Sequence, residues 1–308
     1  MSATVSAARV TIKAQPGDWQ VHEQGGMAFT GAGEHAYFYV EKTTLNSMDV
    51  ARLLGDAYGC ETSAVGLAGL KDKHAITRQW FSVPTPDNCW RLEHPQVRCL
   101  ESARHLKKLR RGELVANRFV ITLRDVVQLP SEDITALNTL GFANFFGPQR
   151  VSADNVAQAT QWLLNRRRRK VSATRRGWYL SVMRSHLFNT VLQHRLDRNI
   201  AAHMQIAGDA LLDARPAGPL WGRGRSVASE DAQALETTAL EPHAQVCEAL
   251  EYAGVSQGLR AYHVIPENLA VTPLAGGCMQ FSFSLPPGAY ATVMLASLAE
   301  VVDASAPR

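Results

Sequence analysis

The sequence predicts an α/β fold of the α+β type, in which two segments rich in β-strands flank a mostly helical block. Short runs of β-branched and aromatic residues alternate with glycine-containing turns over residues 19–124, and a similar run returns at 279–285. Between them, over 154–196, apolar residues recur at helical spacing. The 308 residues, 46% hydrophobic and 19% charged, are enough for one large domain or two of ordinary size. A helical block between two α/β blocks indicates one domain inserted into another.

The individual elements follow from local signals. "AYFYVEK" (36–42) is typical of a strand, and Asn46 or Ser47 is suited to cap a helix that Gly59 ends. Further strands are expected at 19–23, 64–68, 79–83, 97–101, 118–124 and 279–285. Further helices are expected at 131–140, 154–164, 178–196 and 290–301. The Gly-, Pro- and Ser-rich segment 215–232 predicts a loop.

Several classes of protein are disfavoured by composition. No stretch approaches the roughly 18 consecutive apolar residues of a membrane span, and the N-terminal segment lacks the apolar centre of a signal peptide. The five cysteines are scattered and form no C-x-x-C pair, which indicates neither a disulfide framework nor a zinc site. We therefore expect a cytoplasmic protein with reduced thiols and no membrane partner.

Positive charge is gathered in two places, although the net charge is only +4. Residues 104–124 contain seven lysines and arginines, and "RRRRKVSATRR" (166–176) contains no acid. Such clusters favour a polyanionic partner such as nucleic acid, because bound phosphates relieve the repulsion between like charges. The alternative for the second cluster is a solvated helix face.

Common catalytic and cofactor motifs are missing from the sequence. "HEQGG" at His22 lacks the second histidine of a zinc protease, and "GAGEHA" at Gly31 has only two glycines of a dinucleotide fingerprint. There is no phosphate-binding P-loop and no G-x-S-x-G nucleophile elbow. The sequence thus indicates neither a metal nor a cofactor.

Asp72 stands out because it lies between Lys71 and Lys73 in "GLKDKHAITRQ", just before an expected strand. Taken alone, a Gly followed by Lys and Asp is ordinary turn chemistry and predicts a solvated hairpin tip. The wider stretch "AGLKDKHAITRQW" (68–80), however, resembles the A-G-x-K-D-x-x-A-x-T-x-Q signature of the pseudouridine synthase D (TruD) family.

Four more segments resemble motifs of that family in the same order. They are "GDWQVHE" (17–23), "HLKKLRRGELVANRFVITLR" (105–124), "NFFGPQR" (144–150) and "FSLPPGAYAT" (283–292). Five ordered matches span most of the chain. Three departures occur: Trp19 where Phe is usual, Ala116 where Gly is usual, and Val151-Ser152 where Phe-Gly is usual, the last of which could loosen the turn that positions Phe146.

The resemblance implies an enzyme that isomerises uridine to pseudouridine in tRNA, usually at position 13 in the D arm. It implies a pseudouridine synthase fold with a mixed, largely antiparallel sheet, whose catalytic domain comprises residues 1–154 and 258–308. An inserted TruD-type α/β domain would comprise 155–257. The implied partner is tRNA and not DNA, the implied state is a monomer, and no cofactor or metal is implied.

The resemblance assigns the reaction to Asp72, whose carboxylate would attack C1′ of the ribose or remove a ribose proton so that the glycosidic bond breaks. We expect Lys71 or Lys73 to keep this acid ionised and to meet the RNA, and Gly69 to let the backbone bend near the substrate. Glu23 would orient a lysine or the loop.

The remaining implied site residues would bind the substrate. The extruded uridine would stack on Phe146, with Asn144 binding the base or ordering the loop. Asn117 would tie the basic strand to the active-site loop, and Arg175 and Arg176 would face tRNA. Two alternatives stay open: a non-catalytic RNA-binding relative, and an RNA glycoside hydrolase, which a single carboxylate disfavours because such enzymes commonly use two.

Overall fold

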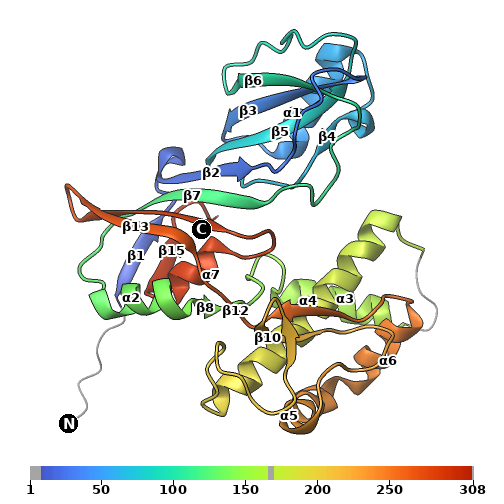
Figure 1. The fold of residues 1–308 in the computed structure, drawn as a ribbon, viewed down its shortest axis with the longest axis vertical. Coiled ribbons are helices and arrows are strands. Elements are labelled where there is room, and N and C mark those ends of the chain that lie inside the picture. The colour runs from blue at the N-terminus through green and yellow to red at the C-terminus, as the bar shows by residue number, and fades with distance from the viewer. Residues whose placement is uncertain (1–7, 166–169, 307–308) are drawn as a thin grey trace. The chain divides into compact units, whose positions relative to one another are not determined.

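The structure is a computed structural model that describes residues 8–165 and 170–306 (Figure 1). It divides into two compact units, each treated by itself below. Unit 1 contains the described residues of Met1–Ile134, Pro266–Gly288 and Leu298–Arg308, and unit 2 contains those of Thr135–Ile265 and Ala289–Ser297. The domain boundaries expected from the sequence, 155 and 257, lie within unit 2, and that division stays a prediction.

Unit 1 is built on an eight-stranded sheet with the order β13-β14-β7-β2-β5-β3-β6, in which β4 also pairs with β5. Every pairing is antiparallel except that of β2 with β5. The strands are β2 (Trp19–Gln24), β3 (His35–Thr43), β4 (Gly66–Leu67), β5 (Ile76–Pro84), β6 (Val97–His105), β7 (Ala116–Leu123), β13 (Glu267–Leu274) and β14 (Cys278–Leu285). The mixed, largely antiparallel sheet expected from the sequence is confirmed.

Helix α1 (Ser47–Tyr58) covers one part of this sheet. It begins after Asn46, whose backbone N–H donates to the Asp49 carboxylate at 3.3 Å, and it ends at Gly59, which has a left-handed φ of 65°. Its buried face, including Val50 and Leu54, packs on apolar side chains of β3 and β5. The helix predicted from the caps is confirmed.

A separate two-stranded parallel pair joins the two ends of the described chain. Strand β1 (Arg9–Ile12) lies beside β15 (Glu300–Asp303), as the blue and red strands of Figure 1 show. The helix expected at 290–301 is therefore too long: α7 (Ala291–Ala296) stops early. Val301, the last residue of the expected helix, and the following Val302 form a ladder with β1 instead.

Unit 2 packs helices around a long central helix and carries small sheets. Its helices are α3 (Ala153–Leu164), α4 (Ala173–Asp197), α5 (Glu230–Leu240), α6 (Ala244–Tyr252) and α7, and α2 (Ser131–Leu140) crosses the boundary between the units. Its strands are β8 (Phe142–Ala143), β9 (Ala210–Leu212), β10 (Arg215–Leu220), β11 (Gly258–Ala261) and β12 (His263–Val264). The 3-10 helices of the described residues are η1 (Pro16–Asp18) and η2 (Thr62–Ala64) in unit 1, and η3 (Glu241–His243) in unit 2. The apolar side of α4, with Leu187, Phe188 and Val191 fully buried, forms the centre of this core.

The loop expected at 215–232 is wrong at both ends. Its first six residues form β10, which is hydrogen-bonded to β9 on one side and to β11 on the other, and its last residues begin α5. Pro216 and Pro219 gave the segment the composition of a loop. Partners distant in the sequence override that local signal.

A buried ion pair in unit 2 leads to a stability prediction. Arg195 donates two hydrogen bonds to Asp209, at 2.8 and 2.7 Å, and the two side chains are 0% and 2% exposed. Asp209→Ala leaves the guanidinium buried without its counter-charge, so we expect it to lower the free energy of unfolding by about 3–5 kcal/mol. The control is Asp213→Asn, because Asp213 pairs with Arg215 at the surface and asparagine tolerates its left-handed φ of 49°, so the loss should stay below about 1 kcal/mol. Urea denaturation measures both, and equal losses would contradict the prediction.

Candidate active site

Asp72 lies in unit 1, in the segment between β4 and β5, and side chains beneath that segment hold its main chain. The backbone N–H of Lys71 donates to Ser47 Oγ at 2.9 Å, and Ser47 Oγ donates to Gln79 Oε1 at 2.6 Å. Gln79 in turn donates to the carbonyl of Gly69 at 3.0 Å. Gly69 itself has no left-handed φ, and a Cβ would fit at its position. The conformation of this loop is therefore held by the hydrogen bonds and does not require the glycine that we expected to allow a bend.

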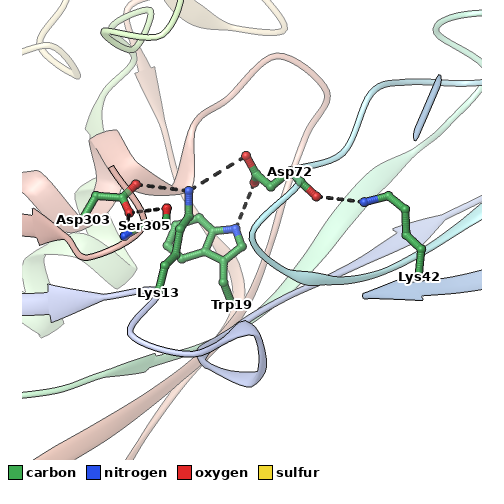
Figure 2. A network of polar contacts seen from close by, with 6 residues as sticks. All are labelled: Lys13, Trp19, Lys42, Asp72, Asp303 and Ser305. Atoms are coloured by element: carbon green, nitrogen blue, oxygen red, sulfur yellow. Dashed lines mark hydrogen bonds and ion pairs between the residues drawn. The ribbon is translucent and has the colours of Figure 1, made fainter. Parts of the chain in front are cut away.

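The Asp72 carboxylate is held from one side by an indole and a lysine (Figure 2). Trp19 Nε1–H donates to Asp72 Oδ2 at 3.0 Å, and Lys13 Nζ lies 4.0 Å from Asp72 Oδ1. The Lys13 ammonium also lies 4.6 Å from the centre of the Trp19 ring and donates to Asp303 Oδ2 at 3.3 Å. The Asp72 side chain remains 32% exposed, whereas that of Lys13 is 4% exposed. The carboxylate is therefore fixed, ion-paired and still accessible.

The pairing of β1 with β15 explains how Lys13 and Asp303 meet. Ile12 lies opposite Asp303 in the register, and Lys13 follows directly in a left-handed conformation with a φ of 56°. Ser305 donates two hydrogen bonds to Asp303 Oδ1, at 2.9 and 2.6 Å. Burial alone would raise the pKa of Asp303, but the Ser305 hydrogen bonds and the charge of Lys13 outweigh it, and the pKa lies below its ordinary value.

A second lysine holds the backbone of Asp72 rather than its side chain. Lys42, on β3, is fully buried and donates to the carbonyls of Leu45 at 2.6 Å and Asp72 at 2.8 Å. Burial lowers the pKa of Lys42 to about 8, although the charge of Asp72 offsets part of the effect. Figure 2 shows Lys42 at the carbonyl of Asp72 and Lys13 at its carboxylate.

The shifted pKa of Lys42 makes stability depend on pH. Between pH about 8 and 10.5, the folded protein has released this proton while the unfolded chain still binds it, so stability rises with pH in that window. Lys42→Met removes this titration. We expect the wild type to gain, relative to Lys42→Met, on the order of 3 kcal/mol at most across the window. Urea denaturation at several pH values checks this, with Lys73→Met, at an exposed lysine, as the control. Parallel curves for wild type and Lys42→Met would contradict it.

Glu23 and Lys71 form a buried ion pair beside the Asp72 loop. Lys71 Nζ lies 2.6 Å from Glu23 Oε2, and the side chains are 5% and 2% exposed. Glu23 Oε1 also accepts the backbone N–H of Trp80 at 3.2 Å. The expectation that Lys71 or Lys73 pairs with the Asp72 carboxylate is thus wrong: Lys71 binds Glu23, Lys73 is exposed, and Lys13 makes the ion pair.

Asn117 lies on β7 directly opposite Glu23 on β2. Its Oδ1 is buried and has no hydrogen-bond partner among the residues that the structure describes. This oxygen therefore makes no tie to the Asp72 loop. Buried amide oxygens usually have a hydrogen-bond partner, so Asn117 Oδ1 is an exception to that rule.

Asn144 and Phe146 lie in unit 2, in a loop that follows β8. The Asn144 side chain donates to the carbonyl of Ala261 at 2.9 Å and accepts from Arg260 at 2.5 Å. Asn189 brackets the main chain of Phe146, accepting from its N–H at 2.9 Å and donating to its carbonyl at 3.0 Å. Both ends of the Asn144 amide are thus engaged by residues of β11.

The ring of Phe146 is half-buried and carries a cation on one face. The guanidinium carbon of Arg260 lies 3.9 Å from the ring centre, and Phe188 packs edge-on at 5.7 Å. Burial lowers the pKa of Arg260 to about 10, which still leaves it charged at neutral pH. The ring is therefore fixed by an arginine on its face and an aromatic edge.

The departure at Val151-Ser152 closes the loop in a different way. Ser152 Oγ accepts the backbone N–H of Asn155 at 3.2 Å and caps α3. Asn155 reaches back to the carbonyls of Gln149 at 3.2 Å and Arg150 at 3.3 Å. The turn that precedes α3 is therefore tied at both ends despite the substitution.

The basic residues do not all remain available to a ligand. Arg124 makes two 2.8 Å hydrogen bonds to Asp18, and Arg104 donates to backbone carbonyls, including that of Thr85 at 2.7 Å. In unit 2, Arg175 and Arg176 are both exposed in the first turn of α4. The arginine run 166–169 lies outside the described residues.

Two negative findings concern metals and membranes. Within residues 8–165 and 170–306, no three side chains of His, Cys, Asp or Glu form a group that could hold a metal ion. Over the same residues, every helix is too short or too polar to span a bilayer.

Comparison with known proteins places the chain in a family. The model of the family "tRNA pseudouridine synthase D (TruD)" matches residues 3–160. A protein of Methylococcus capsulatus named tRNA pseudouridine synthase D is 36% identical over 95% of this chain and 91% of its own length. A protein of the same name from Cellvibrio japonicus is 37% identical over 94% and 89%. The chain belongs to the TruD family.

The TruD fold is also recovered by structural comparison. A crystal structure described as a putative tRNA pseudouridine synthase D from Methanosarcina mazei matches with a TM-score of 0.66, over 96% of this chain and 94% of that one, at 16% identity. The predicted fold is confirmed. Of the residues around Asp72 in this TruD protein, sequence reasoning missed Lys13, Lys42 and Asp303. Trp19 was visible only as a departure from the family motif.

Proposed function

We propose that this protein isomerises uridine to pseudouridine in tRNA, with Asp72 as the catalytic carboxylate. Membership of the TruD family supports the reaction class. The observation that carries the assignment of Asp72 is the geometry of its carboxylate, which is partly exposed, hydrogen-bonded by Trp19 and ion-paired with Lys13. A solvated hairpin tip would need none of these contacts.

The hydrogen bond from Trp19 distinguishes the two oxygens of Asp72. Because Oδ2 accepts the indole N–H, Oδ1 is the oxygen that reacts. In one route, Oδ1 bonds to C1′ as the C1′–N1 bond breaks, and C5 of the turned uracil later displaces it and loses its proton to a base. In the other, the carboxylate takes a ribose proton, the bond cleaves through a glycal, and the proton returns when C5 adds. Both routes need a carboxylate held in a fixed position, which the Trp19 hydrogen bond and the Lys13 ion pair would provide.

The other site residues would bind and position the RNA. The extruded uridine would stack on Phe146, which would offset part of the cost of leaving the helix. Asn144, engaged by Arg260, would order that loop.

The remaining site residues would support the active-site loop and bind the tRNA backbone. Glu23 would hold Lys71 at the edge of the active-site loop, and Arg175 and Arg176 would attract the phosphates. The target would be the uridine at position 13 in the D arm of tRNA. Mapping pseudouridine in total tRNA from cells with and without the gene tests this proposal. Loss of one pseudouridine at position 13 is expected, and an unchanged map would contradict the proposal.

Trp19→Phe should lower kcat for pseudouridine formation about 10-fold and leave KM for tRNA nearly unchanged. The reason is that phenylalanine fills part of the same buried space but donates no hydrogen bond to a charged acceptor. Steady-state kinetics on a tRNA transcript measure this. A thioether isostere of the indole, β-(3-benzothienyl)alanine at position 19, keeps the ring and removes only the N–H, so it should match Trp19→Phe. An isostere as active as the wild type would refute the role of the hydrogen bond.

A further inference from the structure

A cleft of about 800 Å³ opens in unit 2 between α3 and the start of α4. Its volume lies within the roughly 300–1,000 Å³ typical of sites for small organic ligands. None of the described residues that line it is acidic. Its walls carry aromatic, carboxamide and basic side chains, which include Gln158, Gln161, Trp162, Lys170, Arg175 and Tyr179. Neither Asp72 nor Phe146 lines it, so it is distinct from the candidate active site.

One wall of the cleft is an aromatic pair with a fixed arginine. The rings of Trp162 and Tyr179 lie 5.4 Å apart, centre to centre, and are inclined by 31°. Arg175 Nε donates to the hydroxyl of Tyr179 at 2.9 Å, and its guanidinium carbon lies 5.5 Å from the centre of that ring. Tyr179 is only 8% exposed, so its hydrogen bond holds the exposed Arg175 side chain against a buried residue.

These groups match the parts of a nucleotide. An aromatic surface stacks on a base, and a guanidinium or ammonium binds phosphate. The carboxamides of Gln158 and Gln161 offer donors and acceptors for the edge of a base. A purely electrostatic patch would need the cations but not the aromatic wall or the amides.

We propose that this cleft binds an unpaired nucleotide of the RNA substrate, with its base against Trp162 and its phosphate at Arg175. This inference rests on the proposed function, because it takes the substrate to be RNA. A nucleotide held here would anchor the RNA on unit 2 by a contact separate from the modified uridine.

Arg175 and Arg176 form a matched pair for testing this proposal. They are neighbours on α4 and both exposed, but only Arg175 is among the described residues that line the cleft. Arg176 donates to the carbonyl of Ala253 at 2.7 Å. Arg175→Gln and Arg176→Gln therefore remove the same charge from the same helix turn and differ in whether the cleft is affected.

The experiment measures the Kd of an unmodified tRNA transcript and of pentauridylate for the full-length protein by fluorescence anisotropy. We expect Arg175→Gln to weaken both by about 10-fold and Gln161→Ala by about 3-fold. Arg176→Gln loses only a phosphate contact outside the cleft, so it should weaken both by about 3-fold at most. Gln161 is exposed on α3, so its variant should fold even if a change at the partly buried Trp162 does not. Inorganic tripolyphosphate should displace pentauridylate poorly.

Three outcomes would overturn the proposal. They are equal losses for Arg175→Gln and Arg176→Gln, no loss for Gln161→Ala, and displacement by tripolyphosphate as effective as by RNA, which would indicate an anion patch. Pseudouridine formation at saturating tRNA separates this failure from that of the proposed function. If the wild type forms pseudouridine and the variants bind RNA normally, only the proposal of a nucleotide in the cleft is refuted. If the wild type forms no pseudouridine, the proposed isomerase function is refuted.

Discussion

Asp72→Asn should lower the rate of pseudouridine formation by at least about 10³-fold, because an amide is neither a nucleophile toward C1′ nor a base at neutral pH. The fold should survive. Lys42 contacts the backbone carbonyl of Asp72, which the substitution keeps, and the amide oxygen of asparagine can still accept from Trp19. The Kd for tRNA should therefore stay within a few-fold of that of the wild type.

The control for this variant is Lys73→Ala, which changes the adjacent exposed residue of the same loop. It should retain most of the activity, since Lys73 is not the partner of the carboxylate. Single-turnover assays with excess enzyme measure the chemical step for both variants. An Asp72→Asn protein that is folded, binds tRNA and turns over within 10-fold of wild type would remove Asp72 from the mechanism.

Lys13→Met should cause the next largest loss, about 100-fold in kcat with little change in the KM for tRNA. The ammonium of Lys13 lies 4.0 Å from Asp72 Oδ1 and 3.3 Å from Asp303 Oδ2. Methionine keeps the apolar stem of the side chain and removes the charge. Two carboxylates then lose a shared cation, and the Asp72 carboxylate loses the ion pair that fixes its position.

A double variant separates the two roles of Lys13. If Lys13 only neutralised Asp303, then Lys13→Met/Asp303→Asn would be as active as Asp303→Asn alone. We expect the double variant to stay at least about 10-fold below Asp303→Asn, because Asp72 still lacks its cation. Thermal unfolding of all three proteins shows whether a loss of activity is merely a loss of fold. Equal activities of the double and the Asp303 variant would contradict a direct role for Lys13 at Asp72.

The sequence predicted the parts of the site that depend on local signals. Helix α1 was placed correctly, since Asn46 and Gly59 mark its ends within the sequence itself. The loop carrying Asp72 was found because a contiguous stretch resembles a motif of the TruD family, whereas its own turn residues predict only a solvated hairpin tip. Helix caps and contiguous motifs involve residues only a few positions apart, so they can be read from a single sequence.

The partners of Asp72 could not be predicted because they come from distant segments. Lys13 and Asp303 are 290 residues apart and meet only through the parallel pairing of β1 with β15. No local pattern marks that pairing, and Val301 and Val302 fit a helix as easily as a strand until β1 is beside them. Trp19 was noticed as a departure, but its indole N–H has meaning only when Asp72, 53 residues away, lies 3.0 Å from it.

The most direct test of uridine isomerisation at Asp72 is the release of tritium from tRNA that carries [5-³H]uridine, using the purified protein. We expect the wild type to release tritium from one uridine per tRNA with no free uracil, and Asp72→Asn to release none. A wild type that binds the tRNA without releasing tritium, or one that liberates free uracil, would contradict uridine isomerisation at Asp72.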